Sequence, residues 1–359
     1  MGPRQCGKTT LAKQLGGIYF DLEQPSSQLE LDIRWDELVA GDELIILDEA
    51  QEAPDLFARL RGAIDLDRKR NGRFLLLGSV SPNLITGISE SLAGRLASLE
   101  LSPFLLPELP DGKLDELWLY GGYPDGGVLN SESFGAWQES YLQLLCQRDL
   151  PRWGLPAKPR TTERLLHMLV ATQGQALNAS KLGSALSLDH KTVTSYIEFL
   201  EGAYLVRRLD PFHVNIKKRL VKSPRILWRD SGLMHAMQGI KERDQLFLQP
   251  WVGHGWESFV IEQTLSTLAA LGKSVRPFWF RTSDGFELDL VLDWGTERWA
   301  IEIKLTSDPS PSDLQRLDKT ADMIEASQRI LICRVQQPME GKNSLVTNLS
   351  DWTKRLLAI

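Results

Sequence analysis

Cysteine is scarce in this chain of 359 residues: Cys6, Cys146 and Cys333 lie far apart and are odd in number. Such a set excludes a disulfide framework and a four-cysteine zinc site, and it fits a reducing compartment. No stretch approaches the roughly 18 to 20 uncharged apolar residues of a membrane helix, which excludes a spanning segment. The N-terminus also lacks the basic, apolar and small-residue pattern of a secretion signal. The sequence therefore predicts a cytoplasmic protein without a membrane partner.

An excess of positive charge is missing as well. The chain has 41 basic and 47 acidic residues, and a net charge of −6 argues against nonspecific coating of nucleic acid. Basic residues are nevertheless concentrated at positions 207–230, where eight stand against two acidic residues. Two interpretations of this segment stay open: a surface that contacts phosphates, or a solvated strand and loop.

What the sequence does contain is the composition of a globular protein. Hydrophobic residues make up 42% and charged residues 25%, which excludes a disordered or fibrous chain. At roughly 150 residues per domain, the length predicts two or three domains. Residues 1–109 alternate helical segments with apolar runs at 18–22, 44–47, 74–77 and 99–101, as expected for a parallel α/β sheet. Residues 110–211 are mostly helical, and residues 212–359 return to mixed strands and helices.

A phosphate-binding pattern stands at the start of the chain. Residues 2–9 read GPRQCGKT and match G-x-x-x-x-G-K-[ST]. In this pattern Gly2 and Gly7 allow backbone N–H groups to surround the phosphates. Lys8 then reaches the terminal phosphates, and the Thr9 hydroxyl can ligate Mg²⁺. Thr10 opens a helix whose N-terminus faces the anion. The pattern predicts ATP and Mg²⁺ as ligands.

A second acidic pattern supports the first. Residues 43–49, ELIILDE, form an apolar strand that ends in two acids, the Walker B pattern. Asp48 would hold Mg²⁺ and Glu49 would polarise the attacking water. The alternative is a buried strand with solvated acids at its end. Ser79, after the apolar run at 74–77, is placed as a sensor of the γ-phosphate or as a plain turn serine. Arg95 could contact phosphate in its own chain or in a neighbouring subunit of a homo-oligomer, or be a surface arginine.

The strand that usually precedes a phosphate loop is missing, because only Met1 comes before the loop. The sequence therefore predicts a P-loop sheet without its first strand. We expect the natural protein to be longer at its N-terminus; the alternative is an impaired ATPase core.

The middle of the chain has the pattern of a winged helix. Residues 161–172 and 180–186 predict two helices, and Asp189 is a good N-cap for a third helix with apolar residues at the spacing i, i+3, i+4, i+7. Residues 205–209 predict a strand. The third helix would present His190, Lys191, Thr192 and Ser195 outward, where they could meet phosphates or base edges. Protein docking and a purely structural role remain alternatives.

Carboxylates and a lysine gather near the C-terminus. Residues 286–292 and 299–304 predict two adjacent strands joined by a turn. Because side chains alternate along a strand, Asp289 and Glu302 can converge on one divalent metal, with Lys304 beside the attacking water. Glu257, on a predicted amphipathic helix, could add a further carboxylate. The chemistry would be phosphodiester hydrolysis; the alternative is an edge hairpin with solvated charges.

Taken together, these motifs resemble a prokaryotic family of AAA-type ATPases that carry the domain of unknown function 4143 at the C-terminus. The resemblance covers nearly the whole chain and is carried by residues 2–10, LDEAQ at 47–51, GS at 78–79, ESLAGR at 90–95, GGYP at 121–124, WRDSGL at 228–233, WESFV at 256–260, ELD at 287–289 and EIK at 302–304. It implies a P-loop ATPase at residues 1–109, a helical and winged-helix region at 110–211, and a restriction-endonuclease-like PD-(D/E)xK domain at 212–359.

Two classes of function follow from these patterns. In the first, Mg²⁺-dependent ATP hydrolysis is coupled to an activity on DNA, with phosphodiester cleavage by the C-terminal domain. In the second, the protein is a nucleotide-gated regulatory or binding module whose nuclease-like domain is inert.

Overall fold

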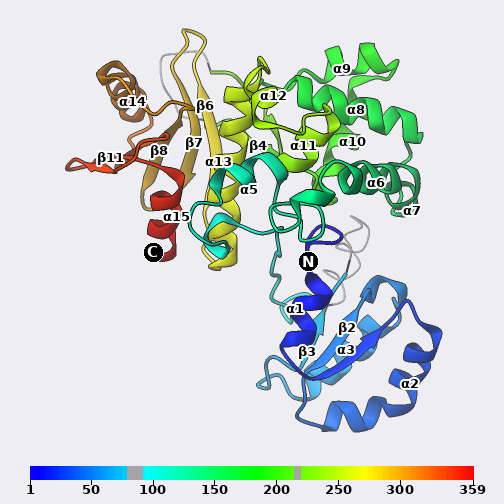
Figure 1. Ribbon diagram of the computed structural model, residues 1–359. Coiled ribbons are helices and arrows are strands. Elements are labelled where there is room, and N and C mark those ends of the chain that lie inside the picture. Colours follow the sequence, from blue (N-terminus) through cyan, green and yellow to red (C-terminus); the bar gives the residue numbers. More distant parts are fainter. Residues whose placement is uncertain (79–91, 214–219) are drawn as a thin grey trace. The chain divides into compact units, whose positions relative to one another are not determined.

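The computed structural model describes residues 1–78, 92–213 and 220–359. The chain divides into two compact units, the first made mainly of residues 1–102 and the second of most of residues 103–359 (Figure 1). Each unit has its own sheet and its own buried core.

The first unit is built on a three-stranded parallel sheet in the order β1-β2-β3. This confirms the parallel α/β sheet that the alternating apolar runs predict. Its strands are β1 (Ile18–Asp21), β2 (Ile45–Asp48) and β3 (Phe74–Leu76). Its helices are α1 (Lys8–Gln14), α2 (Pro25–Ala40), the short 3₁₀ helix η1 (Ala50–Glu52) and α3 (Leu56–Leu66).

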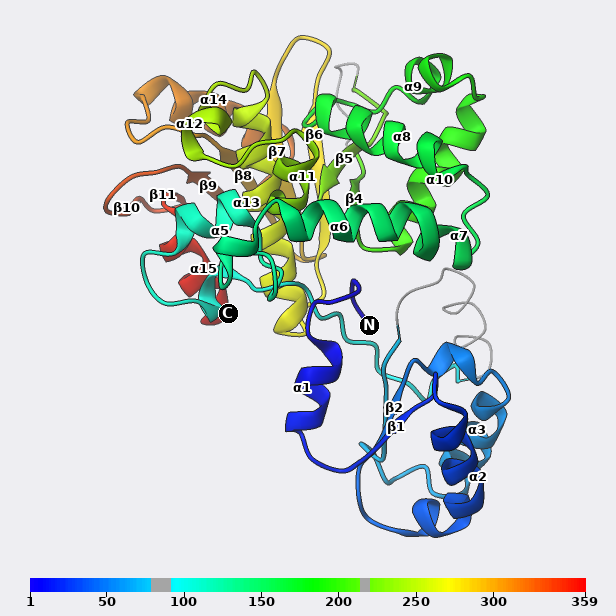
Figure 2. The same ribbon diagram turned by 45° about the vertical axis from the view of Figure 1, so that its right-hand side comes forward.

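Helices cover both faces of this sheet. Phe20 and Leu47 face a core that includes residues of α2 and α3, whereas Ile46 faces Ala12 of α1. Neighbouring residues of a strand point to opposite faces, so α1 lies on one side of the sheet and α2 and α3 on the other (Figure 2). This layering places the start of α1 beside the carboxyl end of β2.

The fourth predicted strand, residues 99–101, does not form. These residues lie outside any strand, and Leu99 is 69% exposed. Their backbone pairs with the chain start instead: Leu101 N donates to Met1 O (2.7 Å), and the terminal amine of Met1 donates to Leu99 O (2.7 Å). The run contains an acid, Glu100, and leaves Leu99 in solvent, so it lacks the packed apolar side chains that favour a strand.

The second unit begins with helices. The helices that precede its sheet are α5 (Leu114–Tyr120), α6 (Ala136–Leu144), a π-helical turn (Leu145–Asp149), α7 (Leu150–Arg152), α8 (Pro159–Ala171), α9 (Ala179–Leu186), α10 (His190–Gly202), α11 (Ser231–Met237), α12 (Arg243–Phe247) and α13 (Val252–Ala270). Short 3₁₀ turns occur at Leu106–Glu108 and Ser131–Ser133. Helices α8, α9 and α10 correspond to the three helices predicted there. The Asp189 carboxylate caps α10 by accepting from the N–H groups of Lys191 (2.8 Å) and Thr192 (3.0 Å).

A six-stranded mixed sheet follows, in the order β10-β11-β9-β8-β7-β6. Strands β6, β7 and β8 are antiparallel neighbours, whereas β8, β9 and β11 are parallel. The strands are β6 (Arg276–Arg281), β7 (Glu287–Asp293), β8 (Arg298–Ile303), β9 (Gln328–Ile332), β10 (Met339–Glu340) and β11 (Ser344–Thr347), with α14 (Pro311–Met323) and α15 (Leu349–Leu357) between and after them. A separate antiparallel pair joins β4 (Val206–Leu209) to β5 (Arg225–Trp228).

Helices also cover both faces of the larger sheet. Ala300 packs with residues of α14, whereas the neighbouring Trp299 contacts Trp352 of α15. Helix α13 packs against β8 and α15 and is buried on nearly all sides, including the polar residues Glu262 and Thr264. The prediction of an amphipathic helix here was therefore wrong, because α13 lies between other elements and has no broad face in water.

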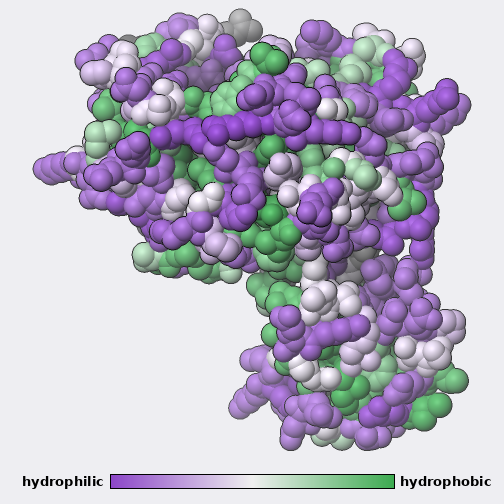
Figure 3. Space-filling view, viewed as in Figure 1, coloured by the Kyte–Doolittle hydropathy of each residue, from purple (hydrophilic) through white to green (hydrophobic). Residues whose placement is uncertain are grey.

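In the part of the chain that the structure describes, no helix combines the length and the apolar character needed to cross a membrane. Hydrophilic residues predominate on the face of the second unit that Figure 3 displays.

Candidate functional site

The phosphate loop occupies residues 2–7 and leads directly into α1. Gly7 precedes α1 with a φ of 99°, a left-handed conformation that strains other residues. At Gly2 the constraint is space, because a Cβ there would lie 2.1 Å from the carbonyl oxygen of Leu101. Both glycines are thus required by the path of the backbone.

Lys8 is held inside its own loop. The side chain is buried, and its ammonium donates to the carbonyl oxygens of Gly2 (3.1 Å) and Pro3 (2.8 Å). A positive group enclosed by a short glycine-containing loop is placed to meet an anion that enters the loop. Thr10, the third residue of α1, is exposed.

Two oxygen donors meet at the end of β2. The Thr9 hydroxyl donates to Asp48 Oδ2 (2.6 Å), and Asp48 is 4% exposed. The phenol of Tyr19, from the neighbouring strand β1, donates to the same oxygen (2.8 Å). Burial and this contact with Asp48 raise the pKa of Tyr19, so the phenol remains a donor. A hydroxyl and a carboxylate in contact are hard donors that suit Mg²⁺.

The residue after Asp48 has an unusual backbone. Glu49 adopts a left-handed conformation with a φ of 51°, and its N–H donates to Asp48 Oδ1 (3.0 Å). The amide of Gln51 donates to the Glu49 carboxylate. Non-glycine residues in this conformation are uncommon and concentrate at functional sites. The sequence signal for Gln51 was its place in the LDEAQ motif, whereas nothing in the pattern pointed to Tyr19.

Ser79 and Arg95 are the remaining predicted phosphate contacts. Ser79 lies outside the described residues. Arg95 forms a bidentate ion pair with Asp65 of α3, and both nitrogen–oxygen distances are 2.8 Å. A phosphate contact by Arg95 would require it to leave this partner.

In the second unit, Asp289 lies where β7 and β8 separate. The pairing of the two strands runs from Asp293 with Arg298 to Leu290 with Ile301. Beyond that point, the N–H of Ile303 donates to the carboxylate oxygen Oδ2 of Asp289 (2.9 Å) instead of to the backbone of β7. The Asp289 carboxylate thus takes the place of a backbone carbonyl of β7 as the hydrogen-bond acceptor. This contact fixes the orientation of the Asp289 side chain.

A buried arginine binds this carboxylate. Arg225, on β5, is 2% exposed and donates to Asp289 Oδ1 (3.4 Å) and to the Glu287 carboxylate. Its guanidinium lies over the Trp279 ring, 4.3 Å from the ring centroid. Sequence reasoning missed this role, and the only signal was membership of the basic segment 207–230.

The other two predicted metal ligands also have partners in the protein. Lys304 Nζ lies 3.0 Å from Glu302 Oε1, and His254 Nδ1 lies 3.0 Å from Glu257 Oε2. Burial raises the pKa of Asp289 well above its usual range, and the charges of Glu257 and Glu302 add to the rise. The three carboxylates are therefore near enough to act on one another.

These carboxylates are nevertheless not arranged as a metal centre. Within residues 1–78, 92–213 and 220–359, no group of three or more His, Cys, Asp or Glu side chains could hold a metal ion. The physical reason is local: the guanidinium of Arg225 holds Asp289, and Lys304 holds Glu302. Asp289 and Glu302 thus each have a cationic partner, and the divalent ion at these carboxylates stays a prediction.

Three arginines of the basic segment pair with carboxylates, two of them with a buried one. Arg207 and Arg229 both contact Glu262 of α13, at 2.6 and 2.7 Å, and Arg208 contacts Asp210 at 2.8 Å. Burial would raise the pKa of Glu262, but the two arginines outweigh it and lower the pKa to about 2. Three further basic residues of the segment lie outside the described residues: Lys217, Lys218 and Arg219.

Comparison with known proteins places these features in a family. An uncharacterized protein of Mycobacterium tuberculosis, Rv2008c, and one of Mycobacterium bovis, Mb2031c, are each 38% identical over 320 residues, which is 88% of this chain and 71% of each relative. The chain belongs to their family. Family models match an AAA domain at residues 1–109, a domain of unknown function (DUF8612) at 111–244 and a domain of unknown function (DUF4143) at 252–352. No solved structure matches the chain.

These matches confirm the resemblance to AAA proteins that carry DUF4143. The residues around Lys8 and Asp48 fall within the AAA domain. Glu257, Asp289 and Glu302 fall within DUF4143, whereas Arg225 falls within the preceding DUF8612 match. The buried ion pair of Arg225 with Asp289 therefore joins the two matched regions of this family member.

Proposed function

We propose that this family member is a Mg²⁺-dependent ATPase whose N-terminal domain, residues 1–109, regulates a DNA-directed C-terminal part. The observation that carries the proposal is the contact between Thr9 and Asp48 beside the loop that encloses Lys8. The AAA-domain match supports nucleotide binding at the same residues.

Each residue has a role in this proposal. Gly2 and Gly7 shape the loop so that backbone N–H groups surround the phosphates, and Lys8 exchanges its carbonyl partners for phosphate oxygens. Thr9 and Asp48 would hold Mg²⁺, which neutralises phosphate charge when bound. Glu49 orients the attacking water and accepts its proton, with Gln51 fixing the carboxylate. Thr10, Ser79 and Arg95 remain predicted contacts of the nucleotide, the last in this chain or in a homo-oligomer.

The test separates binding from hydrolysis. We expect Lys8→Ala to abolish ATP binding in calorimetry. Glu49→Gln should retain binding but slow hydrolysis by about 10²- to 10⁴-fold, the usual contribution of a general base. Lys69→Ala is the matched control, because Lys69 is an exposed lysine of the same unit. Unchanged hydrolysis in both variants would refute the assignment.

For the C-terminal part, residues 212–359, a nuclease-like PD-(D/E)xK architecture without cleavage is the better-supported candidate. Arg225 supports it, because its guanidinium binds Asp289 where a catalytic metal would need an open carboxylate. We expect purified protein with Mg²⁺ or Mn²⁺ to leave plasmid DNA intact. Metal-dependent cleavage that disappears in Lys304→Ala would instead support the nuclease.

A winged helix in residues 110–211 would allow the protein to contact DNA. Helices α8, α9 and α10 are followed by the antiparallel pair of β4 and β5, and Ala176, between α8 and α9, bridges to Arg225 of β5. His190, Lys191 and Ser195 of α10 are exposed, as the winged-helix prediction requires. These features support DNA as the partner.

A further inference from the structure

Tyr19 reaches the nucleotide site from a strand that belongs to neither the phosphate loop nor the Walker B pattern. It is the second residue of β1 and is paired with Ile46 of β2, which is in turn paired with Leu75 of β3. These side chains pack with Ala12 of α1 in a small core on one face of the sheet. The ammonium of Lys13 lies over the Tyr19 ring, 4.3 Å from the ring centroid. Packing between the sheet and α1 therefore fixes the position of the ring.

Asp48 lies on the same face of the sheet. Because side chains alternate along a strand, Ile46 and Asp48 of β2 point to the same side. The Tyr19 hydroxyl donates to Asp48 Oδ2 at 2.8 Å. A phenylalanine at residue 19 could fill the same core but could not make this contact. Packing thus accounts for an aromatic ring at this position, whereas the contact with Asp48 accounts for its hydroxyl.

Among the described residues, three donors hold the Asp48 carboxylate. Oδ2 accepts from Tyr19 and from the Thr9 hydroxyl (2.6 Å), and Oδ1 accepts from the N–H of Glu49 (3.0 Å). Donors on both oxygens fix the rotation of the carboxylate. The Thr9 hydroxyl has one proton and two lone pairs, so it can donate to Asp48 and still ligate Mg²⁺. Tyr19 acts on the same carboxylate from outside the phosphate loop.

We propose that Tyr19 is a positioning residue of the ATPase, whose hydroxyl holds Asp48 in the orientation in which the carboxylate and Thr9 receive Mg²⁺. This inference rests on the proposed function, because it assigns a role within that same site. Groups that hydrogen-bond to a metal-binding side chain set its orientation, and removing them usually costs about 10- to 100-fold in metal affinity or activity. Loss of the Tyr19 hydroxyl should therefore weaken binding of the divalent ion and leave the contacts of Lys8 with the phosphates in place.

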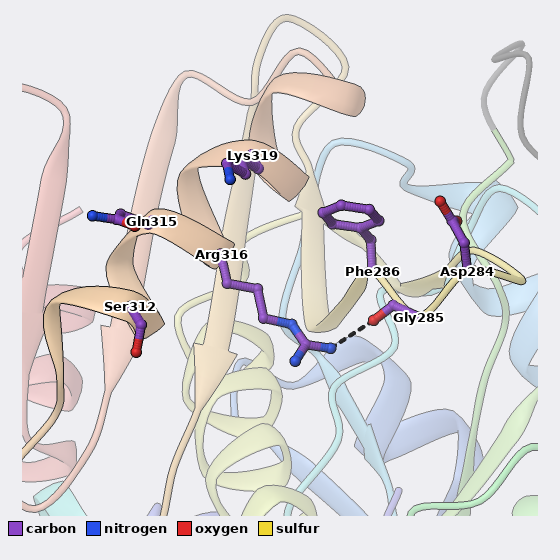
Figure 4. Close-up of a pocket in the computed structure, with 7 residues that line it drawn as sticks. All are labelled: Asp284, Gly285, Phe286, Ser312, Gln315, Arg316 and Lys319. Carbon is purple, nitrogen blue, oxygen red and sulfur yellow. Dashed lines mark hydrogen bonds between the residues drawn. The ribbon is translucent and has the colours of Figure 1, made fainter.

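A pocket of the second unit bears on how the ion is measured. Figure 4 shows this pocket of about 510 Å³ between α14 and the turn that joins β6 to β7, where Arg316 donates to the carbonyl oxygen of Gly285 (2.5 Å). Its lining has two cations, Arg316 and Lys319, and one acid, Asp284, a set that does not suit a divalent cation. Counting only the ion that binds in the presence of nucleotide also separates the nucleotide site from the carboxylates of β7 and β8.

The experiment compares the natural sequence with Tyr19→Phe in three measurements. Calorimetry in EDTA gives the affinity for ATP without a metal, which should be unchanged. Mn²⁺ takes the same oxygen ligands as Mg²⁺ and is detected by electron paramagnetic resonance. With the protein in excess over a non-hydrolysable ATP analogue, the nucleotide-dependent affinity for Mn²⁺ should fall about 10- to 100-fold. Hydrolysis should be slower at limiting Mg²⁺, and saturating Mg²⁺ should restore kcat to that of the natural sequence.

Tyr196→Phe is the matched control. It also removes a phenol hydroxyl that donates a hydrogen bond, but this one contacts the carbonyl oxygen of Pro156 (3.2 Å) in the second unit. All three measurements should be unchanged in this variant. Thermal unfolding of Tyr19→Phe close to that of the natural sequence would show that the core beneath α1 is retained.

The other outcomes contradict the proposal in different ways. If Tyr19→Phe binds Mn²⁺ as tightly as the natural sequence, the positioning role is wrong while the ATPase stands. If the affinity for ATP in EDTA falls by the same factor as the affinity for Mn²⁺, Tyr19 supports the structure of the whole site and does not position Asp48 for the ion. If the natural sequence neither binds nor hydrolyses ATP, the proposed function fails as well.

Discussion

Replacing Arg225 by methionine should convert an ion-paired cluster into a site that accepts a metal. The substitution keeps an unbranched apolar side chain against the Trp279 ring but removes the guanidinium that binds Asp289 and Glu287. Because Asp289 is 5% exposed, its carboxylate then remains buried without a cation. We expect a loss of about 3–5 kcal/mol in the free energy of unfolding, the usual cost of breaking a buried ion pair.

The loss should depend on pH in a defined direction. Burial and the charges of Glu257 and Glu302 already raise the pKa of Asp289, and Arg225 opposes the rise. Without Arg225 the pKa rises further, so the folded state retains a proton that the unfolded state releases. The variant should therefore be most stable at acidic pH and lose stability as pH rises through the folded-state pKa.

The assay is thermal and chemical unfolding with and without Mn²⁺, together with calorimetry. A divalent ion should bind the freed carboxylates of the variant and restore about 2.7 kcal/mol when its concentration is 100 times the dissociation constant. Arg281→Met is the matched control, because Arg281 also contacts Glu287 (3.5 Å) but is half exposed. If the natural sequence binds Mn²⁺ as tightly as the variant, Arg225 does not exclude a metal and the reasoning is wrong.

Two further predictions concern buried acids of the second unit. Glu262→Gln should lower the free energy of unfolding at pH 7 by about 3 kcal/mol, because the pKa of Glu262 is lowered to about 2 by Arg207 and Arg229. When unfolding is measured at decreasing pH, this difference in the free energy of unfolding should shrink below the unfolded-state pKa of about 4.3. A difference that stays constant with pH would contradict the prediction. Gly121→Ala should cost at least about 1–3 kcal/mol in denaturant unfolding, because Gly121 has a φ of 79° and a Cβ would lie 2.3 Å from Asp230 Oδ1. Gly253→Ala, where a Cβ meets nothing within 4 Å, should cost little.

The nucleotide site could be predicted from the sequence because its parts are contiguous. The loop at residues 2–9 contains its own glycines, lysine and threonine, and the Walker B acids directly follow their strand. The parallel sheet then brings the two together, since β2 delivers Asp48 to the end at which α1 begins. Tyr19 was missed because a tyrosine within an apolar strand carries no sign of which acid it will meet.

For the carboxylate cluster, only the tertiary structure shows which cation binds each acid. The sequence predicted Asp289 and Glu302 on two adjacent strands, and they lie on β7 and β8, whereas Lys304 comes directly after the end of β8. The cation that binds Asp289 comes from a position 64 residues earlier in the chain, and no local pattern distinguishes Arg225 from an arginine in water. The same limit applies to residues 99–101 and to α13, whose structures depend on what packs around them. The sequence by itself determined the functional groups whose residues stand close together in the chain. Burial and long-range charge pairing arise only when distant segments meet, because desolvation makes an isolated buried charge unstable.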